Sequence, residues 1–192
     1  PLTVVCDSLL AAATGQAAEA ERWTDVIDRW KYRDAAQPTD PHTKALAAMT
    51  RAFRCRRGVE QMRADADEAV RTFAEGAVPF PAGALLMQGM ARILSGDPDG
   101  GDAIFEDAFS TVAGGGAEVI AYLWCERSLV AMAGGQWDRA EAFASQAHAA
   151  LSPAGMEDAL VCAVQARVAL HRGDLAAARQ ERIGLLRQDP GL

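Results

Sequence analysis

The sequence has little of what a nucleic-acid-binding or membrane-spanning protein requires. Only two of its 19 basic residues are lysines, and 26 acidic residues bring the formal net charge to −7. Nucleic-acid binding depends on clustered positive charge that neutralises phosphates, so we expect no direct nucleic-acid binding by this segment. Apolar stretches such as residues 119–125 are far too short to span a bilayer. No signal-peptide pattern is present, and we therefore expect a cytoplasmic protein.

Residues that carry catalysis or bind metals are few and scattered. None of the three histidines has a carboxylate or histidine at i, i+4, and the four cysteines show neither zinc-site nor redox-motif spacing. These residues are His42, His148, His171, Cys6, Cys55, Cys125 and Cys162. We therefore expect no enzyme activity, no metal and no cofactor. A small helical enzyme is the weakest of the readings.

Two of these residues have specific expectations. The thiols are expected to be buried and free, although Arg54, Arg56 and Arg57 around Cys55 could favour its thiolate and make it redox-sensitive. His42 follows Asp40-Pro41 at the start of a helix and is expected to face solvent.

Other motifs fit helical surfaces and turns. Glycine-rich residues 96–101 and 114–116 lack the Gly-Lys-Ser/Thr of a phosphate loop, and no strand precedes them. The acidic pairs Asp25/Asp28 and Asp65/Asp67 match no calcium loop and fit a solvated helix face.

What the sequence does contain is a regular series of glycines between stretches of helical composition. Their intervals are 43, 38, 39 and 38 residues, at Gly15, Gly58, Gly96, Gly135 and Gly173. Glycine readily takes the left-handed conformation that ends a helix. The residue three positions before each glycine is apolar, and in four of the five units the residues seven before and five after are small. Small side chains on both sides of a turn let two helices approach closely, so the pattern predicts helical hairpins.

The second unit departs from this pattern. Arg51 and Arg63 stand where the other units have small residues. A slightly displaced turn around Gly58 would bring Ala52 and Ala64 together instead, and we take this contact as a hypothesis.

Composition supports an all-α fold. Alanine is abundant and aromatic residues make up 6%, which favours closely packed helices over sheets. We expect helices at about 2–14, 17–35, 40–56, 60–75, 81–95, 99–112, 117–133, 136–151, 156–171 and 174–188. They pair into hairpins at about 1–35, 39–76, 80–113, 116–152 and 155–190. Together they form a single helical-repeat domain, 1–192, and because the sequence starts at Pro1 we expect a fragment of a longer protein.

Two groups of residues are candidates for partner or ligand binding. Arg51 and Arg54, with Arg57 three residues further, form a basic stripe that could bind an anion or an acidic peptide. The alternative is that they pair with carboxylates on the adjacent hairpin.

The second group lies on the first helix of the fourth hairpin. Tyr122, Trp124 and Arg127 combine residue types that dominate binding hot spots. The alternative is that they fill the packing between helices. Trp23 and Trp30, at i, i+7, are expected to form the buried stripe of the second helix.

The C-terminal part of the chain resembles a known family. Residues 161–179, Val-Cys-Ala-Val-Gln-Ala-Arg-Val-Ala-Leu-His-Arg-Gly-Asp-Leu-Ala-Ala-Ala-Arg, follow Gly-Met-Glu-Asp-Ala-Leu at 155–160. They resemble the tetratricopeptide-like (TPR-like) repeats of large LuxR-type regulators related to the maltose activator. The likeness is strongest over residues 117–189. Before residue 117 only the architecture of helical hairpins is similar. In that family the repeats lie between a nucleotide-binding module and a helix-turn-helix DNA-binding domain, whose motifs have no counterpart here, so no functional residue is carried across.

We therefore predict a TPR-like, right-handed superhelix (α-solenoid) of about five antiparallel hairpins. The resemblance implies a regulatory segment of a LuxR-type transcriptional regulator that senses a signal by binding a small-molecule effector, peptide or protein. DNA binding would then belong to a domain outside it. The alternative is a stand-alone TPR-like scaffold for protein–protein interaction. The sequence leaves the ligand, the binding face and the oligomeric state open.

Overall fold

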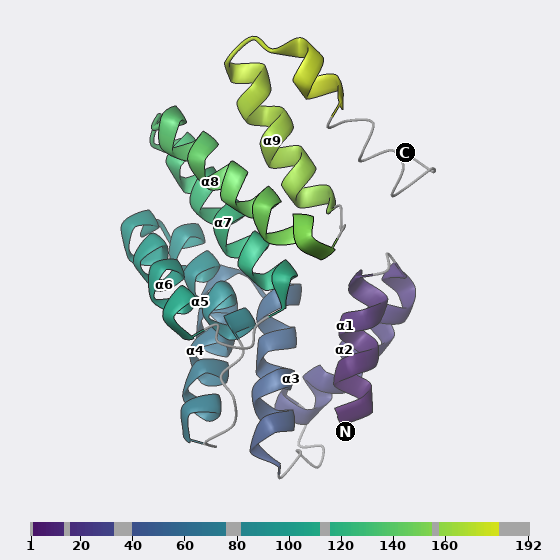
Figure 1. Ribbon diagram of the computed structural model, residues 1–192. Helices are drawn as coiled ribbons and strands as arrows, with labels where there is room; N and C mark the ends of the chain where they lie inside the picture. Colours follow the sequence, from purple (N-terminus) through teal and green to yellow (C-terminus); the bar gives the residue numbers. More distant parts are fainter. Residues whose placement is uncertain are drawn as a thin grey trace. The chain divides into compact units, whose positions relative to one another are not determined.

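The computed structural model describes residues 2–13, 16–32, 40–75, 82–111, 116–154 and 158–180, and every regular element within these ranges is helical (Figure 1). The helices are α1 (Leu2–Ala13), α2 (Ala17–Tyr32), α3 (Pro41–Arg54), α4 (Val59–Glu75), α5 (Ala82–Leu94), α6 (Pro98–Thr111), α7 (Ala117–Ala133), α8 (Trp137–Leu151), the 3-10 turn η1 (Ser152–Ala154) and α9 (Ala159–His171), followed by a helical stretch at 175–180. The predicted all-α fold is confirmed.

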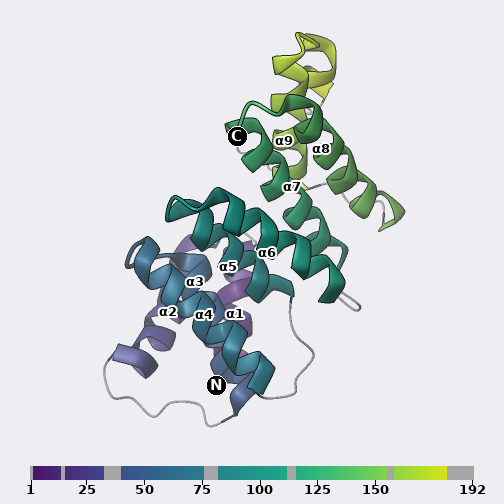
Figure 2. The same cartoon turned by 90° about the vertical axis from the view of Figure 1, so that its left-hand side faces the viewer.

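The chain divides into two compact units, Pro1–Ile104 and Phe105–Leu192. Within the first unit α1 packs on α2 and α3 on α4, and within the second α7 packs on α8 (Figures 1 and 2). The organisation of 1–192 as a single domain stays a prediction. Among the described helices, none is long and apolar enough to cross a membrane.

Glycines in the left-handed conformation close the hairpins, as their spacing predicts. The φ angles are 85° at Gly58, 90° at Gly96, 70° at Gly135 and 78° at Gly173. A side chain is strained at such angles, because its Cβ approaches the backbone. Gly15 lies outside the described residues.

The predicted close contacts between paired helices are confirmed in two hairpins. A Cβ placed on Gly101 of α6 would lie 2.9 Å from the carbonyl oxygen of Gly89 on α5, so these backbones leave no room for a side chain. In the fourth hairpin the Ser128 hydroxyl donates to the carbonyl of Ala140 at 2.7 Å. Small residues therefore mark the crossing points of the helices.

The second hairpin is irregular in a different way from the one expected. Cys55 has a φ of 44° and ends α3 two residues earlier than predicted. Ala52 is buried but Ala64 is exposed, so the hypothesis that these two residues close the hairpin is wrong. Arg51 is buried instead, at 8% exposure, and α3 and α4 meet through charged side chains.

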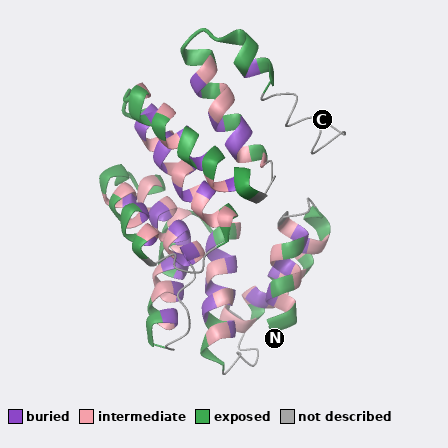
Figure 3. Ribbon diagram, viewed as in Figure 1, coloured by how far each residue is buried: buried purple, intermediate pink, exposed green. Residues whose placement is uncertain are grey.

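Each unit has its own alanine-rich core, and buried residues recur along the helices among half-buried and exposed ones (Figure 3). In the first unit Val5, Ile27 and Ala47 form a small cluster against which the half-buried Trp30 packs. Trp23 is also half-buried, so the two tryptophans lie at the edge of the buried stripe rather than inside it. The second unit has a larger cluster built from α7, α8 and α9.

Two single residues differ from expectation. The ring of His42 packs edge-on against Phe73, with centroids 5.9 Å apart, so His42 is half-buried and does not face solvent. Cys6 is exposed because it lies off the helix face that buries Val5, whereas a buried thiol was expected. Cys125 and Cys162 are buried as predicted.

Candidate functional site

Four charged side chains from three helices meet in the first unit. The Lys31 amine on α2 donates to Asp65 at 2.7 Å and to Glu68 at 2.5 Å, both on α4. Arg51 on α3 donates from Nε to the same Asp65 oxygen at 2.9 Å, and from its terminal nitrogen to Glu68 at 3.3 Å. Burial alone would lower the pKa of Lys31, but the hydrogen bonds to Asp65 and Glu68 outweigh it and raise that pKa. The network ties the first hairpin to the second.

The contacts of Arg51 and Arg54 show where the predicted basic stripe lies in the fold. The guanidinium of Arg51 is directed to Asp65, and Arg54 pairs with Glu21 on α2 of the preceding hairpin. The contact of Arg54 agrees with the alternative in which the stripe pairs with carboxylates on the adjacent hairpin, whereas Arg51 meets carboxylates of its own hairpin. Direct partner binding by Arg51 and Arg54 stays a prediction. The solvated face expected for Asp65 is wrong, because its side chain is 2% exposed and turned to Arg51.

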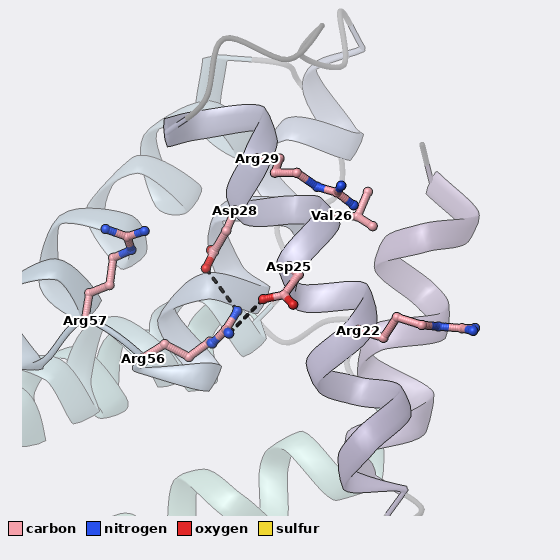
Figure 4. Close-up of a pocket in the computed structure, with 7 residues that line it drawn as sticks. All are labelled: Arg22, Asp25, Val26, Asp28, Arg29, Arg56 and Arg57. Carbon is pink, nitrogen blue, oxygen red and sulfur yellow. Dashed lines mark hydrogen bonds and ion pairs between the residues drawn. The ribbon is translucent and has the colours of Figure 1, made fainter.

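A cavity of about 380 Å³ lies beside this network, between α2 and the turn that joins α3 to α4 (Figure 4). Its lining residues are Arg22, Asp25, Val26, Asp28, Arg29, Arg56 and Arg57. The Arg56 guanidinium donates to Asp25 at 2.8 Å and to Asp28 at 3.1 Å (Figure 4). Burial raises the pKa of Asp28 even though the positive charges of Arg56, Arg57 and Arg51 act to lower it.

The α2 side of this cavity was missed by the sequence reasoning, and so was Arg56 as its bridging residue. A signal was present, because charges of both signs recur at three- and four-residue spacing along 22–29, and four arginines crowd into 51–57. Which segments face each other is decided by packing between hairpins, and that packing cannot be derived from either segment alone.

Aromatic rings and an arginine form a second cluster, within the second unit. Trp124 on α7 stacks against Phe109 on α6, with centroids 4.3 Å apart, and against Phe143 on α8, at 5.4 Å. Arg127 lies 5.5 Å from the Trp124 ring centre and 4.7 Å from that of Phe143. It is 7% exposed, and it pairs with Glu106 at 3.7 Å. The predicted Trp124 and Arg127 are thus brought together, with contacts that match the packing alternative.

Tyr122 lies apart from this cluster. Its hydroxyl donates to Asp158 at 2.7 Å, and Asp158 in turn accepts from the backbone of Leu160 and Val161 at the start of α9. Burial raises the pKa of Tyr122 above its ordinary value, and the hydrogen bond to Asp158 adds to that rise. Tyr122 on α7 therefore contacts the start of α9, whereas Trp124 packs against α6 and α8.

The remaining candidates for chemistry are the thiol of Cys55 and groups of side chains that could bind a metal ion. Cys55 is half-buried and lines a small cavity together with arginines of the basic stripe, and its redox reactivity stays a prediction. Among the residues that the structure describes, no group of three or more histidine, cysteine or acidic side chains is placed to hold a metal ion.

Comparison with solved structures finds a similar fold in PilW, whose crystal structure is described as that of a widely conserved type IV pilus biogenesis factor. The TM-score is 0.60 and the sequence identity is 15%, over the whole of this chain and 79% of PilW. This likeness shows the fold alone, a TPR-like helical repeat. No protein-family model matches the sequence. No curated protein matches it either.

Proposed function

We propose that this chain is a TPR-like scaffold that binds a protein partner on its helical-repeat surface. In helical-repeat proteins the apolar faces are used for stacking, and the surface formed by successive repeats is left for recognition. The observation that carries the proposal is the open, charged cavity formed jointly by the first and second hairpins. A surface built by two repeats has the extent and polarity that suit a protein segment.

The predicted binding residues take two roles in this proposal. Arg54 lines a smaller cavity that shares Asp28, Arg56 and Arg57 with the larger one, and it is paired with Glu21. Arg51, Tyr122, Trp124 and Arg127 hold the hairpins in the shape that the partner meets, since their contacts are with other parts of the chain. A cytoplasmic location belongs to the same proposal.

The test is recovery of a stoichiometric partner with a tagged form of this chain from its own cells, followed by calorimetric titration of the two purified proteins. We expect a saturable complex of defined stoichiometry, with cross-links that fall on the first and second hairpins. If the purified chain instead retains a small cofactor, or turns over a substrate, the scaffold proposal is wrong.

A second candidate is the regulatory segment of a LuxR-type transcriptional regulator, in which an effector or partner signals to attached domains. The resemblance of residues 155–179 supports it. The test is the reading frame of the gene: a nucleotide-binding module upstream and a helix-turn-helix domain downstream would favour it. A stop codon directly after Leu192 and a start codon directly before Pro1 would exclude it.

A further inference from the structure

The first hairpin is joined to the second by two groups of ion pairs that differ in their exposure to solvent. The inner ion cluster is the network of Lys31, Arg51, Asp65 and Glu68. The outer ion cluster consists of Glu21, Asp25 and Asp28 on α2 with Arg54 and Arg56 at the end of α3 and in the turn that follows. In both clusters α2 of the first hairpin meets side chains of the second hairpin.

The outer ion cluster is organised around one guanidinium. Glu21, Asp25 and Asp28 are spaced at i, i+4, i+7 and so share one face of α2. Arg54 pairs with Glu21. Arg56 contacts all three carboxylates, at 2.8 Å for Asp25, 3.1 Å for Asp28 and 3.2 Å for Glu21 (Figure 4). The attachment of this part of α2 therefore depends on charge, and on Arg56 above all.

Solvent reaches the outer ion cluster but not the centre of the inner one. The side chains of Glu21 and Asp25 are 45% and 62% exposed, and that of Arg56 is 32% exposed. The side chains of Asp65 and Arg51, by contrast, are 2% and 7% exposed. Salt screens exposed ion pairs far more than buried ones, and the Debye length falls from about 10 Å at 0.1 M to about 3 Å at 1 M. Salt therefore weakens the outer ion cluster first.

The described apolar cluster at this joint takes little from the second hairpin. Val5 and Ile27 are buried against Ala47 of α3, whose side chain is one methyl group, with the half-buried Leu46 beside it. Helices α3, α4 and α5 share a separate core, which consists of Ala45, Ala48, Ala69, Phe73 and Ala84. Since this core contains no residue of the first hairpin, the second hairpin keeps it when the joint loosens.

We propose that the first hairpin is a detachable repeat: rising ionic strength opens the outer ion cluster, while Lys31 keeps the end of α2 attached to α4. A helix as short as α2 is marginally stable without tertiary contacts, so its N-terminal part frays once Arg54 and Arg56 release it. The charged cavity is lined from both α2 and the α3–α4 turn, so it is complete only in the docked state. The opening itself does not depend on the proposed scaffold function.

The test is hydrogen–deuterium exchange of the whole chain at 50 mM and at 1 M sodium chloride, with mass spectrometry of peptides from 17–28, 59–75 and 117–133. The wild type is compared with Arg56→Gln, which removes the central charge of the outer ion cluster, and with Arg56→Lys, which retains it. Arg71→Gln is the matched control, because it loses the same charge from an exposed position whose pair with Glu75 lies within α4.

In the wild type we expect 1 M salt to speed exchange in 17–28 by about fivefold or more, and in 59–75 and 117–133 by less than about twofold. Arg56→Gln should exchange faster than the wild type in 17–28 already at 50 mM salt, and its response to salt should be less than about half the wild-type factor. Arg56→Lys and Arg71→Gln should respond to salt as the wild type does.

Exchange in 17–28 that salt leaves unchanged in the wild type, or that rises equally in α2 and α7, would overturn the proposal, because screened charges then do not hold the joint. A full salt response retained in Arg56→Gln would overturn it as well, since the sensitivity would lie elsewhere. The wild-type series decides even if Arg56→Gln fails to fold. The chain is tested without a partner, so a failure here leaves the scaffold function standing, and failure to find a partner leaves the opening standing.

Discussion

Removal of the Asp65 carboxylate is the sharpest test of how the first two hairpins are held together. Asp65 accepts from Lys31 at 2.7 Å and from Arg51 at 2.9 Å, and its side chain is 2% exposed. In Asp65→Ala the Arg51 guanidinium, 7% exposed, would keep only the longer contact to Glu68 at 3.3 Å. Loss of one partner from a buried ion pair costs about 3–5 kcal/mol, because a desolvated charge is left behind.

The partly exposed Lys31 and Glu68 can recover some solvation, so we expect the lower part of that range, about 3–4 kcal/mol. For an m-value of about 2 kcal/mol/M in urea, the unfolding midpoint falls by about 1.5–2 M. Equilibrium urea unfolding followed by circular dichroism measures it. The matched control is Arg71→Ala on the same helix, since the pair of Arg71 with Glu75 is 3.9 Å long and exposed on both sides. Its expected cost is under about 0.5 kcal/mol.

A double-mutant cycle with Arg51→Ala separates the pairing from the loss of side-chain packing. We expect Asp65→Ala and Arg51→Ala together to cost clearly less than the sum of the two single changes, because the second change removes the unpaired charge. The apolar replacement Arg51→Met/Asp65→Leu should accordingly be more stable than Asp65→Ala alone. A cost below about 1 kcal/mol for Asp65→Ala, or strict additivity in the cycle, would refute the view that a buried ion network joins these helices.

Three further predictions use other parts of the fold. Gly101→Ala is expected to cost about 1–3 kcal/mol in thermal or urea unfolding, because the new Cβ would lie 2.9 Å from a backbone oxygen. The control is Gly134→Ala, which should change stability by less than about 1 kcal/mol. A Cβ at Gly134 has its nearest neighbour at 3.7 Å, and the φ of this residue is −82°. Tyr122→Phe is expected to cost about 1 kcal/mol, and ultraviolet titration should show that it removes a tyrosine ionisation whose pKa lies above the ordinary value. The raised pKa of Tyr122 means that its stabilising effect is present below about pH 10 and is lost as the pH rises through the raised value. Ionisation of Tyr122 at the ordinary pKa of tyrosine would contradict this. Arg127→Ala is expected to cost about 2 kcal/mol and to change the emission of Trp124, since it removes a buried cation from two ring faces. The pair of Arg127 with Glu106 adds little to this, because Glu106 is exposed. An unchanged unfolding midpoint would show that the cluster does not stabilise the second unit.

The site shows where sequence reasoning stops. The arginines at 51–57 were recognisable as an unusual charge cluster, and pairing with carboxylates of the adjacent hairpin was foreseen for Arg54. The roles of single residues could not be predicted from the sequence. Asp65 was expected to face solvent and is buried, and the sequence did not indicate that residues of α2 line a cavity. Tyr122 and Trp124 are two positions apart on α7, about 200° around the helix, so they meet different helices although they are close in sequence.

The sequence by itself determined the series of helical hairpins. The left-handed turn at Gly96 or Gly135, and the close approach of α5 and α6 at Gly89 and Gly101, depend on residue type and local spacing, so they can be read from the chain. Only the tertiary structure decided which charges are buried and which lie at the surface. Burial of Arg51 depends on Asp65 and Glu68, which α4 brings to it from 14 and 17 positions further along the chain. Arg54 meets Glu21 of α2, which lies 33 positions before it.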